Sequence, residues 1–204
     1  MGILFGTDGI RGVANTYPMT AEMALRVGRA LAVLFAPPEG APFVIGRDTR
    51  ISGDMLAHAL AAGICSMGGN VAMAGVLPTP GVAHLTRAAK GAAGIVISAS
   101  HNPFQDNGIK IFTGDGYKLS DVSEAEIEAL VLKADLAARA ESIQATGGVR
   151  PVPDAGQRYV NFLIATAPSG DFLSGRRIVL DCANGATSAV APRLFSSLGA
   201  AVTT

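Results

Sequence analysis

Short strands rich in β-branched residues alternate along this chain with Ala- and Leu-rich segments of helical period. Residues 43–45, 71–74 and 94–97 are apolar runs of strand length. The segments between them repeat apolar residues every three or four positions, as amphipathic helices do. Parallel strands need a crossover of this kind to bring the chain back to the same end of the sheet. The pattern predicts an α/β fold with a mixed, mainly parallel sheet and helices on both faces.

The end of the sequence looks like a second copy of an earlier part. Residues 178–180 form an apolar run that ends at Asp181, and an Ala-rich helical segment follows. This order echoes the strand, polar loop and helix over residues 44–68. We therefore expect a first domain over residues 1–168 and the start of a second, similar α/β domain over residues 169–204. Because the sequence stops where the repeat should enter its next strand, we interpret it as truncated. Two ordinary strand–helix units that merely look alike are the alternative.

The composition is that of a globular protein without a strongly charged face. The chain has 204 residues, 49% of them hydrophobic, and its 16 Lys and Arg are balanced by 16 Asp and Glu. A neutral chain with scattered cations gives no reason to expect nucleic acid or a membrane as a partner. Only two cysteines occur, far apart, so neither a disulfide framework nor a cysteine zinc site is indicated. We expect a cytoplasmic protein with no export signal and no membrane anchor.

Polar and turn-forming residues are concentrated in four loops, at residues 7–12, 46–50, 98–103 and 106–110. Familiar nucleotide-binding and serine-hydrolase signatures are absent. No lysine follows a glycine as a P-loop requires, and the two serines of the third loop do not lie between glycines. Instead, the four loops combine cations, hydroxyls and glycines, which are the groups that a phosphate site uses.

Three loop motifs carry a family resemblance. The sequence reads FGTDGIRG at residues 5–12, SASHNP at residues 98–103 and DNGIK at residues 106–110. In this order and spacing the motifs resemble the first domain of the α-D-phosphohexomutases. The first motif at the very N-terminus, and Ser98 where many relatives have threonine, resemble the phosphoglucosamine mutase branch. The resemblance covers essentially the whole chain, because DCANGA at residues 181–186 is similar to the start of the family's second domain.

The resemblance implies roles for four residues: Ser100, Lys110 and His101 as catalytic residues and Arg11 as a phosphate-binding residue. Ser100, the second serine of its motif, would carry the transferable phosphoryl group and offer one of its oxygens to a metal ion. Lys110 would assist proton transfer at the attacking hydroxyl, and Arg11 and His101 would lie beside the phosphoserine. The alternatives are an exposed lysine that ends a turn, a loop histidine bonded to backbone, and Ser98 as the phosphorylated residue.

The implied reaction converts glucosamine 6-phosphate to glucosamine 1-phosphate through a phosphoserine and a sugar bisphosphate. The family uses Mg²⁺, held by the phosphoserine and by three aspartates of an Asp-Gly-Asp-Gly-Asp-Arg loop in the second domain. These 204 residues contain no such loop. We therefore expect this chain alone to bind Mg²⁺ weakly, to be inactive, and to self-associate through a strand edge left uncovered near Val202. The alternatives are a phosphomannomutase or phosphoglucomutase, or a non-catalytic fragment that binds a phosphosugar or a partner chain.

Three smaller expectations concern neighbouring segments. We interpret Arg47, Asp48 and Arg50 as an ion-pair cluster that stabilises a loop and extends to an interdomain contact, not as catalytic residues. Ser52 or Asp54 is expected to cap the following helix. Residues 146–153 are expected to be the most flexible stretch of the chain.

Overall fold

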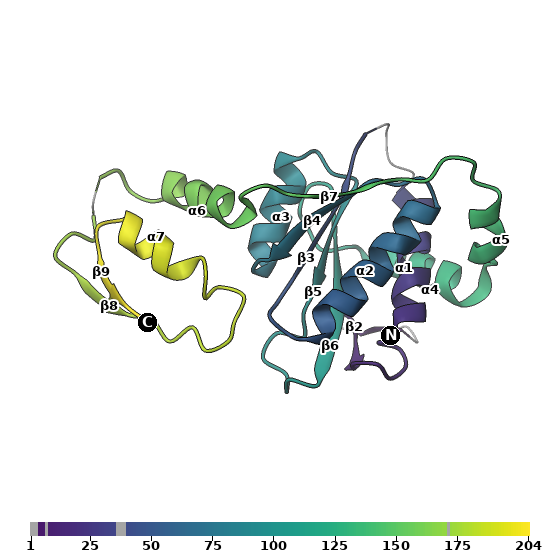
Figure 1. The fold of residues 1–204 in the computed structure, drawn as a ribbon, viewed down its shortest axis with the longest axis horizontal. Helices are drawn as coiled ribbons and strands as arrows, with labels where there is room; N and C mark the ends of the chain where they lie inside the picture. The colour runs from purple at the N-terminus through teal and green to yellow at the C-terminus, as the bar shows by residue number, and fades with distance from the viewer. Residues whose placement is uncertain (1–3, 7, 36–39, 171) are drawn as a thin grey trace.

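The computed structural model describes residues 4–6, 8–35, 40–170 and 172–204. Thr7 of the first motif and residues 1–3, on which the expectation about an export signal partly rests, lie outside these ranges. A seven-stranded sheet lies between two layers of helices, and a two-stranded sheet lies at one end of the molecule (Figure 1). The expected α/β architecture, with a mixed sheet and helices on both faces, is confirmed.

The large sheet has a parallel part and an antiparallel part. The strands are β1 (Phe5–Gly6), β2 (Gly9–Val13), β3 (Phe43–Arg47), β4 (Val71–Val76), β5 (Ala93–Ile97), β6 (Asp106–Thr113), β7 (Val149–Pro151), β8 (Arg177–Val179) and β9 (Ala201–Thr203). Their order in the large sheet is β1-β2-β6-β5-β3-β4-β7. Strands β5, β3, β4 and β7 are parallel neighbours. Strands β6, β2 and β1 continue the sheet beside β5 in antiparallel fashion.

Two helix layers cover the large sheet. The helices are α1 (Ala21–Phe35), α2 (Ser52–Ser66), α3 (Thr79–Ala88), α4 (Asp121–Lys133), α5 (Leu136–Glu141), α6 (Ala155–Thr166) and α7 (Ala191–Ser197). Helices α1, α2 and α4 cover one face, and α3 and α6 cover the other (Figure 1). Within the described ranges, no helix is long and apolar enough to span a membrane.

Alternating side chains of the central strands build one hydrophobic core on each face of the sheet. In β3, Phe43 and Ile45 belong to the core beneath α1 and α2, whereas Val44 belongs to the core beneath α3 and α6. Successive side chains of a strand point to opposite faces, so a strand covered on both faces is apolar at every position. This burial explains the continuous apolar runs that predicted the parallel strands.

Helices α1 and α2 cross at a contact made by two glycines. A Cβ on Gly28 would lie 2.2 Å from the carbonyl oxygen of Leu60, and a Cβ on Gly63 would lie 2.1 Å from that of Leu25. The two backbones approach this closely only because neither glycine has a side chain. The contact fixes the position of α2, which follows directly on the loop at residues 48–51.

The last part of the chain forms a strand, a helix and a second strand. Strands β8 and β9 are parallel neighbours, and α7 connects them. Val190, the residue before α7, packs in the same core as Tyr159 and Val160 of α6. The predicted strand and helix in this region are present. They pack against α6, which belongs to the helix layer that also contains α3.

The expectation of a flexible stretch at residues 146–153 is wrong. Its central residues form β7, in which Val149 is the parallel partner of Val71 in β4. The N–H of Gly148 also donates to the side chain of Asn70 at 3.0 Å. A glycine-rich segment is therefore ordered here by a strand that lies far away in sequence.

The predicted helix cap is also wrong. The residue before α2 is Ile51, which makes no side-chain capping bond. Ser52 instead accepts a hydrogen bond from the Asn107 amide at 2.8 Å, and Asp54 forms an ion pair with Arg47. Both polar side chains are engaged by other segments and not by the first turn of their own helix.

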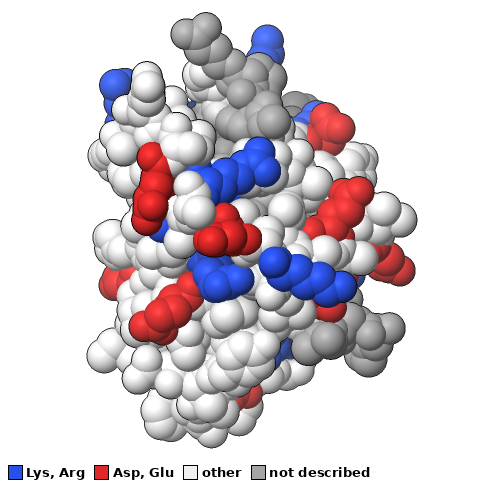
Figure 2. Space-filling model, turned by 90° about the vertical axis from the view of Figure 1, so that its right-hand side faces the viewer, with Lys and Arg blue, Asp and Glu red and all other residues white. Residues whose placement is uncertain are grey.

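Figure 2 shows the face that lies on the right-hand side of Figure 1. Lys and Arg side chains are interspersed with Asp and Glu side chains there, in keeping with the formal net charge of zero.

Candidate active site

Two of the polar loops follow neighbouring parallel strands and lie at the same edge of the sheet. Strand β3 leads into residues 48–51, and β5 leads into residues 98–104. A cavity of about 810 Å³ is lined by these loops, by residues 77–80 at the start of α3, and by residues 182–187. The last of these segments lies between β8 and α7, in the part of the chain from β8 to β9 that we call the second unit. Open α/β sheets bind ligands outside the carboxyl ends of their strands. This cavity is therefore the candidate active site.

Ser100 is exposed and lines the cavity, in a backbone conformation that residues other than glycine seldom adopt. Its φ is 57°. The hydroxyl oxygen of Ser98 accepts the N–H of Ser100 at 3.0 Å, and Ser98 is buried, with 7% of its surface exposed. The two serines therefore differ: Ser98 supports the turn, and Ser100 presents its hydroxyl to the solvent.

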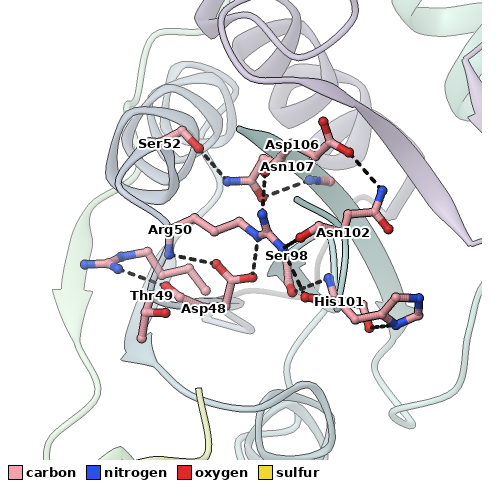
Figure 3. A network of polar contacts seen from close by, with 12 residues as sticks. Asp48, Thr49, Arg50, Ser52, Ser98, His101, Asn102, Asp106 and Asn107 are labelled. Carbon is pink, nitrogen blue, oxygen red and sulfur yellow. Dashed lines mark hydrogen bonds and ion pairs between the residues drawn. The ribbon is translucent and has the colours of Figure 1, made fainter. Parts of the chain in front are cut away.

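The ring of His101 lies next to the Ser100 hydroxyl. Its Nδ1 is 3.4 Å from Ser100 Oγ, and the exposed residue also lines the cavity (Figure 3). Which atom donates depends on the ring nitrogen that carries the proton. The ring is thus placed to interact with a group attached to Ser100.

Arg50 is at the centre of the contacts that shape the Ser100 loop (Figure 3). Its Nε forms an ion pair with the carboxylate of Asp48 at 3.0 Å. Its two Nη atoms donate at 2.5–3.0 Å to four carbonyl oxygens, those of Ser100, Asn102, Pro103 and Asp106. A guanidinium has five N–H groups. One carboxylate oxygen and four carbonyl oxygens give each of them an acceptor here.

Asp48 holds Arg50 in turn. Its second carboxylate oxygen accepts the backbone N–H of Arg50 at 3.0 Å, and both side chains are largely buried, with 12% and 10% of their surfaces exposed. Arg47 instead pairs with Asp54, at 2.8 Å. The predicted ion pair of Asp48 with Arg50 is confirmed, whereas Arg47 forms its ion pair with Asp54, outside the predicted cluster.

The loop after β3 contacts the second unit at the cavity. The hydroxyl of Thr49, between the two charged residues Asp48 and Arg50, donates to the backbone carbonyl of Asn184. The N–H of Ala183 donates to the carboxylate of Asp181, which fixes the turn at that point. The loop after β3 therefore touches the DCANGA motif directly.

Arg11 and Lys110 meet at Asp8. One carboxylate oxygen of Asp8 lies 2.7 Å from Arg11 Nη2 and 2.8 Å from Lys110 Nζ. The hydrogen bond from Lys110 lowers the pKa of Asp8 below its ordinary value. The charge of Lys110, with the hydrogen bond and charge of Arg11, acts in the same direction, against the desolvation of partial burial. The three residues form an ion-paired group across β2 and β6.

This ion-paired group lies beside the strand that leads into Ser100. Lys110 is opposite Val96 of β5, and the N–H of Ser98 donates to the carbonyl of Gly108 at 2.9 Å. Neither Arg11 nor Lys110 is among the described residues that line the cavity. The structure thus places the four expected residues in two groups, Ser100 with His101 at the cavity and Arg11 with Lys110 at Asp8.

The described residues include no group of three or more His, Cys, Asp or Glu side chains that could hold a metal ion. Asp8, which contacts Arg11 and Lys110, and Asp48, which lines the cavity, are each paired with cations. Of the expected site, Ser100 is the residue that would offer a metal ion an oxygen, once it is phosphorylated.

Sequence reasoning did not assign a site role to Asp8 or Arg50. Asp8 stands in the first motif, three residues before Arg11, but its contact with Lys110 depends on the pairing of β2 with β6. Arg50 was interpreted as part of a local ion-pair cluster. Its other partners are backbone carbonyls, which leave no mark in the sequence.

Most of the chain matches a known protein family. Residues 2–138 match the family model described as phosphoglucomutase/phosphomannomutase, alpha/beta/alpha domain I. The chain belongs to the phosphoglucomutase/phosphomannomutase family. This assignment confirms the phosphohexomutase resemblance that the three loop motifs indicated.

Several phosphohexomutases are similar over nearly all of this chain. It is 56% identical over 205 residues to a phosphoglucosamine mutase of Syntrophus aciditrophicus, covering 100% of this chain and 46% of that protein. It is 54% identical over 200 residues to one of Geotalea daltonii, covering 98% and 44%. A solved phosphoglucomutase/phosphomannomutase family protein from Burkholderia thailandensis superposes with a TM-score of 0.76 at 27% identity, covering 98% of this chain and 43% of that one. The chain spans about half the length of the curated relatives it matches.

Proposed function

We propose that the full-length protein carrying this sequence is a phosphoglucosamine mutase, which converts glucosamine 6-phosphate to glucosamine 1-phosphate. The observation that carries the proposal is the exposed Ser100 hydroxyl, presented at a cavity by a left-handed backbone conformation within the SASHNP motif. The relatives that bear this name, 56% and 54% identical along nearly the whole chain, support the choice of sugar.

Two phosphoryl transfers account for this reaction. The free hydroxyl of the sugar monophosphate attacks the phosphorus of phosphorylated Ser100. A new P–O bond forms as the bond to Ser100 Oγ breaks, and the attacking hydroxyl loses its proton. The sugar bisphosphate then turns over, and Oγ of Ser100 attacks the other phosphorus as the serine hydroxyl loses its proton. The bond from that phosphorus to the sugar oxygen breaks, and this oxygen takes up a proton. The cycle ends with Ser100 phosphorylated again and the isomeric monophosphate released, so no phosphate is consumed.

Three residues would supply positive charge and proton transfer in this scheme: His101 at the cavity, and Arg11 and Lys110 at Asp8. Phosphoryl transfer depends mainly on positioning and on neutralising charge. We assign His101, whose Nδ1 is 3.4 Å from Oγ, to stabilising the phosphoserine oxygens. Arg11 would bind phosphate, and Lys110 would exchange a proton with the attacking hydroxyl. Asp8, bonded to both, would keep these two cations oriented side by side.

The proposed reaction also uses Mg²⁺, which would supply further charge neutralisation. Phosphorylated Ser100 would offer this ion one oxygen. Mg²⁺ demands a near-octahedral shell of oxygen ligands, and the described residues have no group of acidic side chains to complete it. The described residues therefore do not make up a complete magnesium site by themselves.

We further propose that residues 1–168 are the phosphoserine domain and that residues 169–204 begin a second domain of similar build. The large sheet ends with β7 and the small sheet begins with β8, which supports a boundary between them. A cytoplasmic location is part of this proposal. The free thiols of Cys65 and Cys182 support it, because unpaired cysteines suit a reducing compartment.

The test is a mutase assay on the full-length protein with Mg²⁺ and a sugar bisphosphate as activator. We expect conversion of glucosamine 6-phosphate to be faster than that of glucose or mannose phosphates, and intact mass to show one phosphate on Ser100. Preference for mannose or glucose phosphates would overturn the assignment of the sugar. A stable phosphate on Ser100 without turnover would instead favour a binding protein.

A further inference from the structure

We propose that Arg50 is a positioning residue for phosphoryl transfer, which holds the Ser100 loop in the shape that presents the serine hydroxyl. This inference rests on the proposed function for its chemical meaning. The shape of the loop can be measured independently of that function. Arg50 acts through the backbone of residues 100–106, because its described bonds to that segment go to carbonyl oxygens.

Hydrogen bonds hold both the backbone N–H and the backbone carbonyl of Ser100. The hydroxyl of Ser98 accepts the N–H of Ser100 at 3.0 Å, and Nη2 of Arg50 donates to the carbonyl of Ser100, also at 3.0 Å. The φ of 57° between these groups lies in the left-handed region, which is unfavourable for a residue with a Cβ. Such a conformation persists only where its surroundings enforce it. Ser98 and Arg50 are the groups that enforce it here.

The guanidinium also closes the rest of the loop. Besides the Ser100 carbonyl, it binds the carbonyls of Asn102, Pro103 and Asp106, so the chain wraps around one cation. These carbonyls would otherwise require water or would turn outward. The Asn102 amide reinforces the same curve by donating to the Asp106 carboxylate at 3.0 Å.

Arg50 is itself tied to the central sheet. Asp48 accepts both the Nε and the backbone N–H of Arg50, and the N–H of Asp48 donates to the carbonyl of Ile97 at 3.0 Å. Ile97 is the last residue of β5. A continuous set of bonds therefore runs from the end of a buried strand through Asp48 and Arg50 to Ser100. Preorganisation of this kind is what brings reacting atoms into line for a displacement at phosphorus.

The geometry predicts that lysine cannot replace Arg50. A lysine keeps the charge but offers three donors on one nitrogen, whereas the four carbonyls and Asp48 surround a planar, five-donor group. Arg47, the last residue of β3, is a matched control. Its described side-chain partners are Asp54 and the carbonyl of Asp48, which lie outside the Ser100 segment.

The experiment compares Arg50→Lys, Arg50→Ala and Arg47→Lys in the full-length protein. The first readout is the rate at which a sugar bisphosphate phosphorylates Ser100, followed by rapid quench and intact mass. The second is the KM for glucosamine 6-phosphate, and the third is amide hydrogen exchange of residues 99–107. We expect Arg50→Lys to slow phosphorylation roughly tenfold to a hundredfold, with a smaller change in KM and with faster exchange confined to the loop.

The controls separate positioning from general loss of structure. Arg47→Lys should stay within about twofold of the wild-type rate. Guanidinium ion, added well below denaturing concentrations, should restore part of the rate of Arg50→Ala by occupying the vacated space between the carbonyls. If Arg50→Ala does not fold, Arg50→Lys decides.

Two results would overturn the proposal: wild-type phosphorylation with unchanged loop exchange in Arg50→Lys, or equal losses in Arg50→Lys and Arg47→Lys. Absence of phosphorylation on Ser100 in the wild-type protein would instead refute the proposed function. In that case, amide hydrogen exchange of the loop in Arg50→Lys would still test the positioning role of Arg50. Exchange at the wild-type rate would show that Arg50 does not hold the loop.

Discussion

The hydroxyl of Ser98 accepts the backbone N–H of Ser100 at 3.0 Å, so the first serine of the motif shapes the presentation of the second. In the full-length protein, Ser100→Ala should remove both the phosphate and the activity and leave the fold intact, because the side chain is exposed.

Ser98→Ala should still take up phosphate, but roughly two- to tenfold more slowly, because one hydrogen bond to the Ser100 backbone is lost. Intact mass and peptide mapping measure both effects, with Ser98→Thr as the control that keeps the hydroxyl. Phosphate on Ser98 in the Ser100→Ala variant would show that the assignment is reversed.

Asp8→Asn should lower kcat/KM by roughly tenfold to a hundredfold. The substitution removes the carboxylate that binds Arg11 and Lys110, so the two cations would repel each other and lose their common orientation. Steady-state assays of the full-length protein measure this loss. Asp115→Asn, in an exposed turn, is the matched control and should behave as the wild type. A normal kcat/KM in Asp8→Asn would remove Asp8 from the site.

Acid unfolding should also report on Asp8. Its pKa is lowered in the folded protein from the ordinary value of 3.8, chiefly by the hydrogen bond from Lys110. The stability that this ionised group contributes is fully present above the unfolded pKa and is lost as the pH falls through the lower, folded pKa. Asp8→Asn should therefore lose less stability than the wild type below about pH 4. Identical acid-unfolding curves would contradict this expectation.

His84 should make the fold less stable as the pH falls below 6.5. Its ring stacks on Phe162 with centroids 3.9 Å apart. Burial lowers the pKa of His84 from 6.5, and the charges of Arg158 and Arg87 act in the same direction. The unfolded chain therefore binds a proton at a higher pH than the folded chain, and acid favours unfolding. Thermal unfolding between about pH 7 and about pH 5 should show a larger drop in Tm for the wild type than for His84→Gln. An NMR titration that gave His84 a pKa above 6.5 in the folded protein would refute this prediction.

Gly28→Ala and Gly63→Ala should each destabilise the protein by roughly 1–3 kcal/mol. Each new Cβ would lie within 2.2 Å of a carbonyl oxygen on the opposite helix, so α1 and α2 would have to separate. Gly156→Ala in α6 is the control, because the nearest atom to its Cβ is 3.9 Å away. Replacing glycine with alanine in an uncrowded helix stabilises by up to about 1 kcal/mol. Denaturant titration measures all three, and equal effects would mean that the glycine contact is unimportant.

A polypeptide of these 204 residues alone should bind Mg²⁺ weakly and show no measurable mutase turnover. The described residues lack a group of carboxylates that could complete an oxygen shell around the ion. Calorimetric titration with Mg²⁺ and a mutase assay test this expectation, with the full-length protein as the positive control. Sedimentation of the same polypeptide tests the expected self-association near Val202. Mg²⁺-dependent turnover by the purified polypeptide would show that its site is self-contained.

The sequence predicted those features that depend on local pattern. The buried run that became β5 and the loop with Ser100 were located by apolar continuity and by the motif that follows it. The strand and the helix predicted near the C-terminus are present as β8 and α7, which local pattern also indicated.

Features that depend on contacts between distant segments were missed. Strand β7 forms because β4 offers an edge to a glycine-rich segment. Ser52 does not cap α2, because its hydroxyl accepts a hydrogen bond from the Asn107 amide on β6 instead. Arg50 recognises carbonyl groups, which every residue has, so no sequence pattern marks the residues that it binds. These contacts become visible only once the strands are in register.

The walls of the cavity come from loops that are some eighty residues apart in sequence, at residues 98–104 and 182–187. A molecule that fills the cavity touches both, so its affinity is thermodynamically linked to the attachment of the C-terminal unit to the large sheet. Ligand present at about a hundred times its Kd would strengthen that attachment by roughly 2.7 kcal/mol, provided that it binds only the joined form. The rate of proteolysis between α6 and β8 would then report how much of the protein has ligand in its cavity, without any measurement of enzymatic turnover.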